Sequence, residues 1–255
     1  GFSDGLPVSV GHDRQKGTRN APPLFTTAWT RELFWDGRAP SLEAQALEPL
    51  TNPREMAATP AIIEAWINTE ERYRTAFAPW VGTRRIDVHD IAHALAVYQR
   101  SLRPPRNRWD RVFSQGIDAL DDQQLLGLHL FRTKAGCANC HSGPLLTDQR
   151  FHNLGLGRIG TPRQDLGRYA VSHDPADIAA FRTPSLRGLI HTRPYMHDGS
   201  MPFLVPVVLL YAGGGGVAEV PASDRLPESK RSPLLHDRAL STEERAALVA
   251  FLETL

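Results

Sequence analysis

The sequence predicts a mainly α-helical protein with long ordered loops. Several segments place apolar residues at helical spacing behind residues that favour helix N-caps. The alternation of apolar and polar residues that is typical of half-buried strands is scarce. Residues 1–40 are rich in Gly, Pro, Asn and Asp without a sustained period, which indicates loop. Loops of this length are uncommon unless they are functional, so we expect them to surround a site.

The first helices are predicted from their start and stop signals. Ser41 is a suitable cap for a short helix, which we expect to end at Pro49. Thr59 followed by Pro60 is typical of an N-cap and a first helical position. The apolar residues at helical spacing after this cap are Ile62, Ile63, Trp66, Ile67, Tyr73 and Phe77.

Three further helices are expected along the rest of the chain. Residues 87–102 place one apolar face on a helix that ends before Pro104 and Pro105, which mark a candidate domain boundary. Asp121 and Asp122 open another helix, and residues 241–244 form a capping box for a final helix to Leu255. The predicted apolar face of the 87–102 helix consists of Ile91, Ala94, Leu95 and Tyr98.

Composition narrows the class of protein. With 255 residues, the chain can form one large domain or two small ones, each with its own core. The formal net charge of +1 gives no reason to expect binding to nucleic acid or to an anionic membrane. No apolar run approaches the roughly 20 residues that a membrane span needs. The chain starts at Gly1 without an initiator methionine, so we expect a mature or trimmed product.

The two cysteines of the chain lie in the stretch Cys137-Ala138-Asn139-Cys140-His141. The pattern C-x-x-C-H is typical of covalent attachment of a c-type haem, with the histidine binding the iron. A redox dithiol would fit a βαβ setting, which is not evident here. A zinc site would need a second ligand pair, and His89 with His93 fits a helix surface equally well.

A covalent haem has consequences for location. Attachment of c-type haem in bacteria takes place outside the cytoplasm, so the motif predicts a periplasmic protein. Both cysteines would be bound to the haem, which leaves none for a disulfide and is compatible with that compartment.

The chain resembles the bacterial di-haem cytochrome c peroxidase and MauG family over nearly its whole length. Residues 19–23, 34–39, 41–49 and 52–56 carry part of the resemblance, including the Phe34-Trp35-Asp36-Gly37-Arg38 run. Residues 151–155, 182–187 and 194–199, which end in His197-Asp198-Gly199, carry the rest in the same order.

This resemblance implies two cytochrome-c-like haem domains. We expect an N-terminal peroxidatic domain at residues 1–103 and a C-terminal haem c domain at residues 104–255. The attachment motif for the N-terminal haem normally precedes the segment that matches residues 1–20, so we expect it from an upstream segment. The alternative is a protein that has lost its peroxidatic haem.

The resemblance also assigns residues to the peroxidatic site. Glu55 matches the distal glutamate, which moves a proton between the two oxygens of peroxide, and Gln45 and Pro49 match residues of the same pocket. Trp35 matches a tryptophan between the haems that relays electrons, although a large aromatic residue equally suits a core. We expect the other four tryptophans to be packing residues.

Further residues match a calcium site and two histidines of the family. Asn20, Thr192 and Pro194 match calcium ligands, the last two through backbone carbonyls, and oxygen donors suit this ion. His12 aligns with a histidine that occupies the peroxidatic iron in some peroxidases, but it fits a surface histidine equally well. His197 matches a histidine near a haem edge.

The sixth ligand of the C-terminal haem separates the branches of the family. Electron-transfer peroxidases use a methionine fourteen residues after the histidine of the His-Asp-Gly motif, and this position is Tyr211 here. MauG-like enzymes use tyrosine, an anionic donor that stabilises oxidised iron. Met196 and Met201 are the rival ligands. Ala135 stands where MauG has a tryptophan that leads to its protein substrate, so we expect a different exit route.

Three functions follow from this resemblance. The leading hypothesis is a MauG-like periplasmic di-haem oxidase, in which hydrogen peroxide generates a high-valent di-haem state. That state would oxidise an aromatic residue of a partner protein, with tryptophan as the first expectation. The alternative is a cytochrome c peroxidase that draws electrons from a small cytochrome or cupredoxin. A third hypothesis is a mono-haem electron carrier, which would not react with peroxide.

Overall fold

The computed structural model describes residues 3–255, and these residues form a mainly helical fold with little sheet. The α-helices are α1 Leu42–Thr51, α2 Pro60–Thr69, α3 Glu71–Val81, α4 Val88–Ser101, α5 Arg108–Gln115, α6 Asp122–Arg132, α7 Tyr169–Ser172, α8 Leu204–Ala212 and α9 Thr242–Leu252. The 3₁₀ helices are η1 His12–Arg14, η2 Thr27–Trp29, η3 Ile117–Ala119, η4 Cys137–Asn139, η5 Pro175–Asp177 and η6 Leu189–His191. The strands are β1 Phe151–Asn153, β2 Ala180–Arg182, β3 Glu219–Val220 and β4 Ser229–Lys230.

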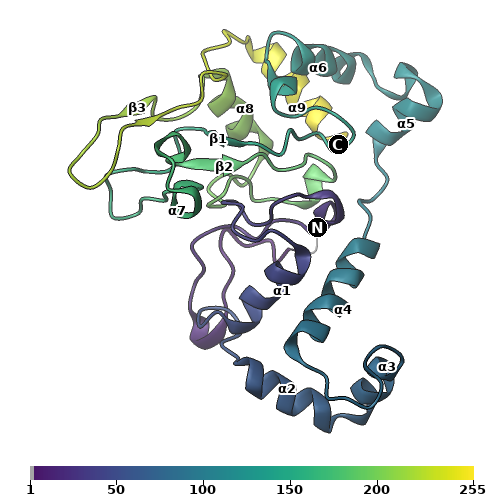
Figure 1. Cartoon of the computed structure of the whole chain (residues 1–255). Helices are drawn as coiled ribbons and strands as arrows, with labels where there is room; N and C mark the ends of the chain where they lie inside the picture. Colours follow the sequence, from purple (N-terminus) through teal and green to yellow (C-terminus); the bar gives the residue numbers. More distant parts are fainter. Residues whose placement is uncertain (1–2) are drawn as a thin grey trace.

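These elements form two lobes (Figure 1). The lower lobe contains α1 to α4, and the upper lobe contains α5 to α9 with the short strands. The loop before α1 runs between them. Residues 102–107 carry the chain from α4 to α5, in the region of Pro104 and Pro105. None of the helices in residues 3–255 has the length and apolar character needed to cross a bilayer.

The helix starts of the lower lobe follow the predicted caps, but one predicted end is wrong. The hydroxyl of Ser41 accepts a hydrogen bond from the Ala44 amide, and Thr59 caps α2 ahead of Pro60. Pro49 lies inside α1, which continues to Thr51. Proline has no N–H, so α1 lacks the intrahelical hydrogen bond that residue 49 would donate to the Gln45 carbonyl, yet the helix continues for two more residues.

The predicted apolar face of α4 is also partly wrong. The buried residues of this helix are Val88, Ala92, Ala96 and Gln99, whereas Tyr98 is exposed. Helix α4 packs against α1, and small alanines on the shared face let the two backbones approach closely. Large apolar side chains therefore lie beside this contact rather than in it.

Two small cores hold the lower lobe together. Leu33, Ala39, Leu42 and Ala96 form one core between the loop, α1 and α4. The second consists of Ile67, Phe77 and Ile86, where α2, α3 and the start of α4 meet. The predicted helical run after Thr59 breaks into α2 and α3 at Glu70. Several of its large residues, including Ile62 at 64%, are exposed.

One larger core organises the upper lobe around α6, α8 and α9. Asp121 and Ser241 form the capping boxes at the starts of α6 and α9, and α9 ends at Leu252 rather than the predicted Leu255. Helices α6 and α9 pack closely at Gly127, where an added Cβ would lie 2.0 Å from the Ala247 carbonyl oxygen. This core surrounds the segment that carries the two cysteines.

Two short antiparallel sheets support the loops beside this core. Strands β1 and β2 pair with His152 opposite Phe181, and β3 pairs with β4. The β1–β2 sheet fixes the direction of His152, and the amide of Arg182 in β2 donates a hydrogen bond to the Trp35 carbonyl of the N-terminal loop. The sheet therefore connects the loop before α1 with the upper lobe.

A buried ionic network makes the main polar connection between the loop and the upper lobe. The Arg19 guanidinium binds both oxygens of Asp165 at 2.7 Å and also contacts Asp36. Arg38 binds Asp36 from the other side. Asp36 is only 5% exposed, so its charge requires these partners.

Candidate functional site

The cysteine motif folds as a tight turn that lines a cavity formed by the upper lobe, the N-terminal loop and parts of α1 and α4. Cys137 begins η4, and its carbonyl accepts hydrogen bonds from the amides of Cys140 and His141 at 3.2 and 2.9 Å. Gly136 precedes the turn with φ near 67°, and an added Cβ would lie 2.6 Å from the Arg238 guanidinium. All three motif residues line the same cavity.

His141 is oriented as an iron ligand. Its Nδ1 lies 3.1 Å from the carbonyl oxygen of Leu146, and a carbonyl can only accept, so Nδ1 carries the proton. This leaves the lone pair of Nε2 available for a metal. Burial lowers the pKa of His141, which favours the neutral imidazole that binds iron.

The two thiols do not have the environment of a redox dithiol. Burial raises the pKa of Cys137 to about 12 and that of Cys140 to about 11. Reactive dithiols instead have lowered thiol pKa values that favour the thiolate. The environment around these cysteines therefore suits attachment to a haem better than thiol exchange.

Helix α8 brings Tyr211 to the same cavity. The cavity-lining residues of α8 follow helical spacing, so one face of the helix forms part of the wall. Burial raises the pKa of Tyr211, and the nearby Cys137 and Cys140 sulfurs raise it further. The residues on this face are Leu204, Val207, Val208, Tyr211 and Ala212.

The cavity has the chemical composition that a covalent haem requires. Two thiols, a histidine with a free Nε2 and a tyrosine hydroxyl share it with apolar side chains such as Phe131. Met196 also lines the cavity, next to His197, whereas Met201 does not line it.

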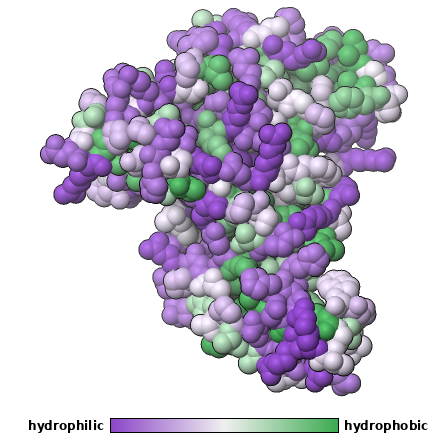
Figure 2. All heavy atoms as spheres, in the orientation of Figure 1, coloured by the Kyte–Doolittle hydropathy of each residue, from purple (hydrophilic) through white to green (hydrophobic). Residues whose placement is uncertain are grey.

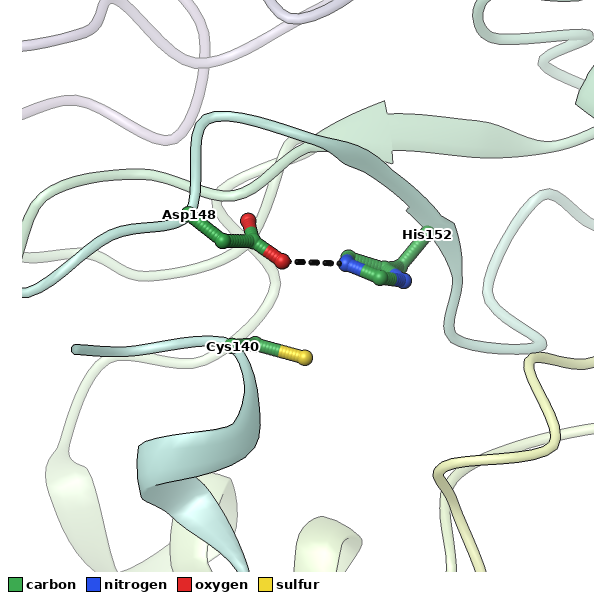
Figure 3. A group of neighbouring side chains, drawn as sticks. All are labelled: Cys140, Asp148 and His152. Carbon is green, nitrogen blue, oxygen red and sulfur yellow. Dashed lines mark hydrogen bonds and ion pairs between the residues drawn. The ribbon is translucent and has the colours of Figure 1, made fainter.

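A cluster of Cys140, Asp148 and His152 lies beside the motif (Figure 3). One potential ligand atom from each residue falls within 4.8 Å of the others, and His152 Nε2 is 2.8 Å from Asp148 Oδ2. A haem thioether would use the Cys140 sulfur and leave two protein ligands, too few for a structural zinc site. His89 and His93 are exposed on α4 and join no such cluster among residues 3–255.

The predicted peroxidatic residues lie at different places around the lower lobe. Gln45 on α1 lines the cavity, whereas Pro49 and Glu55 do not. Glu55 is half-buried and accepts a 2.8 Å hydrogen bond from the side-chain amide of Asn52. The Glu55 carbonyl accepts a 2.7 Å bond from the backbone amide of His12. The His12 side chain is 53% exposed and lies near Asp13.

Trp35 belongs to the N-terminal loop and lines the cavity. Its indole Nε1 donates a 2.9 Å hydrogen bond to the Asn20 carbonyl, and the side chain lines the cavity. The Asn20 side chain is buried and donates through Nδ2 to the carbonyls of Leu6 and Pro7. The loop thus fixes the indole against the cavity wall.

The three predicted calcium ligands line one large cavity. Asn20, Thr192 and Pro194 are the residues concerned. The backbone amide of Asn20 donates a 2.7 Å hydrogen bond to the His197 carbonyl. Within the described part of the chain, no hydrogen-bond donor reaches Asn20 Oδ1 or the carbonyl oxygens of Thr192 and Pro194. His197 is buried and stacks on Phe181 at 3.8 Å between ring centroids. Burial lowers the pKa of His197.

Sequence reasoning missed Gln99. This residue is buried on α4, lines the cavity, and its Oε1 has no hydrogen-bond partner among residues 3–255. A buried polar atom without a partner is rare and indicates a ligand or water. The available sequence signal was its position one helical turn after Ala96, on the buried face of α4.

Comparison with known proteins gives a consistent family. Residues 1–118 match the di-haem cytochrome c peroxidase family. The whole chain is 38% identical to the methylamine utilization protein MauG of Methylorubrum extorquens, covering 69% of it. It is 32% identical over its whole length to the cytochrome-c peroxidase IdrP1 of Pseudomonas sp., covering 72% of that protein.

A solved structure agrees with these relatives. The crystal structure of a MauG-like protein associated with microbial copper homeostasis matches with a TM-score of 0.85 and 32% identity. The match covers 99% of this chain and 79% of that one.

Proposed function

The chain belongs to the di-haem cytochrome c peroxidase and MauG family and is a haem-dependent oxidoreductase. From this we propose that it is a MauG-like periplasmic enzyme that uses hydrogen peroxide to oxidise an aromatic residue, first of all tryptophan, on a partner protein. The observation that carries the proposal is Tyr211 on the wall of the cavity that holds Cys137, Cys140 and His141.

The residues of the C-terminal site would hold a c-type haem. Cys137 and Cys140 would form its thioether bonds, His141 would bind the iron through Nε2, and Tyr211 would supply the second protein ligand. The haems, when bound, supply the redox chemistry by which hydrogen peroxide takes up two electrons and two protons and becomes two waters. A tyrosine ligand favours oxidised iron, which suits an oxidising enzyme more than an electron entry site.

Glu55 is the proposed proton carrier. A carboxylate near bound peroxide can take a proton from one oxygen and return it to the other. The hydrogen bond from Asn52 and the backbone contact with His12 fix the position of Glu55. Gln45 and Pro49, on successive turns of α1, are proposed to line the same pocket. The Trp35 indole, held by the Asn20 carbonyl, is proposed to pass electrons between the two sites.

Calcium is the proposed structural ion. Asn20 Oδ1 and the carbonyl oxygens of Thr192 and Pro194 are three oxygen donors without other partners among the described residues. Calcium accepts such a set and completes its shell with water. Because Asn20 belongs to the N-terminal loop, the ion would fasten this loop to the upper lobe.

The experiment that tests the proposal replaces the axial tyrosine in the holoprotein with both haems. We expect Tyr211→Phe to abolish peroxide-driven oxidation of the partner aromatic residue, because the oxidised iron loses its anionic ligand. Tyr211→Met should raise the reduction potential of this haem by on the order of 0.1 V, within the range of about 0.8 V that axial ligands span. Tyr195→Phe is the matched control, since Tyr195 lines the same cavity. Full oxidation by Tyr211→Phe, or a thioether absorption band in the unmodified protein, would contradict the assignment.

One observation favours a second function. His12 lies beside Glu55 through its backbone amide, which suits a cytochrome c peroxidase whose histidine blocks the peroxidatic iron until reduction. The relative IdrP1 is named a cytochrome-c peroxidase. In that case a reduced small cytochrome or cupredoxin would be consumed rapidly with peroxide, and His12→Ala would remove the need for reductive activation.

A further inference from the structure

A row of aromatic rings connects the C-terminal cavity with the surface at α5. Phe131 on α6 lines the cavity, and its ring centroid is 5.3 Å from that of Phe251 on α9. Phe251 lies 5.5 Å from Trp109 on α5, and Trp109 lies 5.5 Å from Phe113 on the next turn. All three pairs meet edge to face, the usual geometry of packed aromatic rings. Phe113 is 76% exposed.

Trp109 is the member of this row that can be oxidised most easily, because an indole loses an electron far more readily than a phenyl ring. It packs against the core that surrounds the cavity. Trp29, Trp66 and Trp80 are exposed and do not line the cavity. Ala135, which precedes the cysteine motif, has no aromatic ring and cannot act as a relay.

We propose that Trp109 is a relay through which the partner protein reduces the C-terminal haem site. The proposal rests on the proposed function and names the place where the partner donates its electrons. Trp109 gives one electron toward the cavity along the Phe251 and Phe131 rings, and it regains one electron from an aromatic residue of the partner. Two such cycles supply the two electrons that one hydrogen peroxide consumes, and the oxidised partner residue releases the two protons.

The surface around Phe113 fits this role. Ile117 on η3, which packs against α5, is 56% exposed. Figure 2 shows hydrophobic atoms gathered at the upper right of the molecule, over the region of α5. An aromatic residue of a partner protein can be buried against such a patch, in contact with the end of the row.

The test uses the holoprotein with both haems, without its partner, and compares Trp109→Phe with the control Trp80→Phe. After hydrogen peroxide is added, peptide mass mapping should find oxygen added mainly at Trp109 in the unmodified protein. Loss of an electron from Trp109 should leave a tryptophan radical that is visible by electron paramagnetic resonance. Its signal should narrow when the tryptophan rings are deuterated in the unmodified protein, but not in Trp109→Phe. The haem state formed by peroxide should decay to the resting state several-fold more slowly in Trp109→Phe than in the unmodified protein. In Trp80→Phe it should decay at the normal rate.

A conservative variant separates electron transfer from packing. Trp109→Tyr keeps an oxidisable ring, so the oxidised haem state should decay at close to the normal rate in this variant. A purely structural role of Trp109 predicts that Trp109→Tyr and Trp109→Phe slow the decay equally. If peroxide is consumed but Trp109 is oxygenated no more than Trp80, the relay is wrong and the proposed function stands. If the holoprotein does not consume peroxide, both proposals fail.

Discussion

The upper lobe gathers Cys137, His141 and Tyr211 around one cavity inside a continuous core. The lower lobe has two small cores, and Glu55 lies outside that cavity, positioned by Asn52 and by the backbone of His12. The C-terminal haem site is therefore preorganised by packing, whereas the position of Glu55 depends on a few hydrogen bonds of loops. A substitution that disturbs packing in the upper lobe should mainly lower the stability of the fold. A substitution that disturbs packing around Glu55 should mainly slow the reaction with hydrogen peroxide.

The largest effect is expected where the two regions are joined. Arg19→Met leaves the buried carboxylate of Asp36 and the partly buried carboxylate of Asp165 without their main partner, so we expect a loss of about 3–5 kcal/mol in the free energy of unfolding. Urea denaturation of the holoprotein measures it. Arg38→Met removes a more exposed partner of Asp36 and should lower stability less. Equal losses in both variants would show that burial of Arg19 is not decisive.

This effect should depend on pH. Burial acts to raise the pKa of Asp165, but the hydrogen bond and charge of Arg19 lower it below its usual value. A carboxyl with a lowered pKa in the folded state stabilises the protein above the pKa of the unfolded state, and this stability is lost as pH falls. The difference between Arg19→Met and the unmodified protein should therefore be largest near neutral pH and shrink in acid.

Two glycine substitutions test the difference between the two regions, one at the contact between α6 and α9 and one beside Glu55. At Gly127 an added Cβ would meet the Ala247 carbonyl, and at Gly11 it would lie 2.2 Å from the Arg54 carbonyl and 2.7 Å from the Glu55 Cα. We expect Gly127→Ala to lower the free energy of unfolding by about 1–3 kcal/mol. Gly11→Ala should shift Glu55 and slow the reaction with peroxide, with a smaller loss of stability.

Urea denaturation and rapid mixing with peroxide measure the two effects separately. Gly17→Ala is the matched control in the same loop, because its Cβ would have no neighbour closer than 3.6 Å. If Gly11→Ala reacts with peroxide at the normal rate, the assignment of Glu55 as proton carrier loses its main structural argument.

Calcium removal should have the smallest effect. If the ion binds in the 0.1–1 mM range typical of extracellular modules, 1 mM calcium adds about 1 kcal/mol to the stability of the folded state. Thermal unfolding of the holoprotein, first with chelator and then with added calcium, measures this difference. Magnesium is the control ion, because it requires a smaller and more regular shell. Equal midpoints with calcium and magnesium would argue against the site formed by Asn20, Thr192 and Pro194.

The sequence predicted features that are encoded locally. The caps at Ser41, Thr59, Asp121 and Ser241 were found because each depends on residues within one turn of the helix start. The haem motif was found for the same reason, since all its reactive groups lie within five residues. The family resemblance then supplied Tyr211, which no local pattern indicates.

Features that depend on distant packing could not be predicted in this way. The face of α4 that packs against α1 is formed largely by small residues such as Ala96, so hydrophobic periodicity identified the buried residues of this helix only in part. The partners of Arg19 lie 17 and 146 residues away in the sequence, and Gln99 resembles any surface glutamine until α4 is placed. The edge-to-face contact of Trp109 with Phe251 joins helices from opposite ends of the C-terminal half.

The contact between Arg19 and Asp165 also sets an order of assembly. The two residues are 146 positions apart, and ribosomes add roughly 5–20 residues per second. Arg19 therefore exists for on the order of ten seconds before Asp165 is made. Contacts across such a distance must also overcome a large loss of chain entropy. The loop before α1, although synthesised before the upper lobe, is thus expected to be among the last segments to reach its final position.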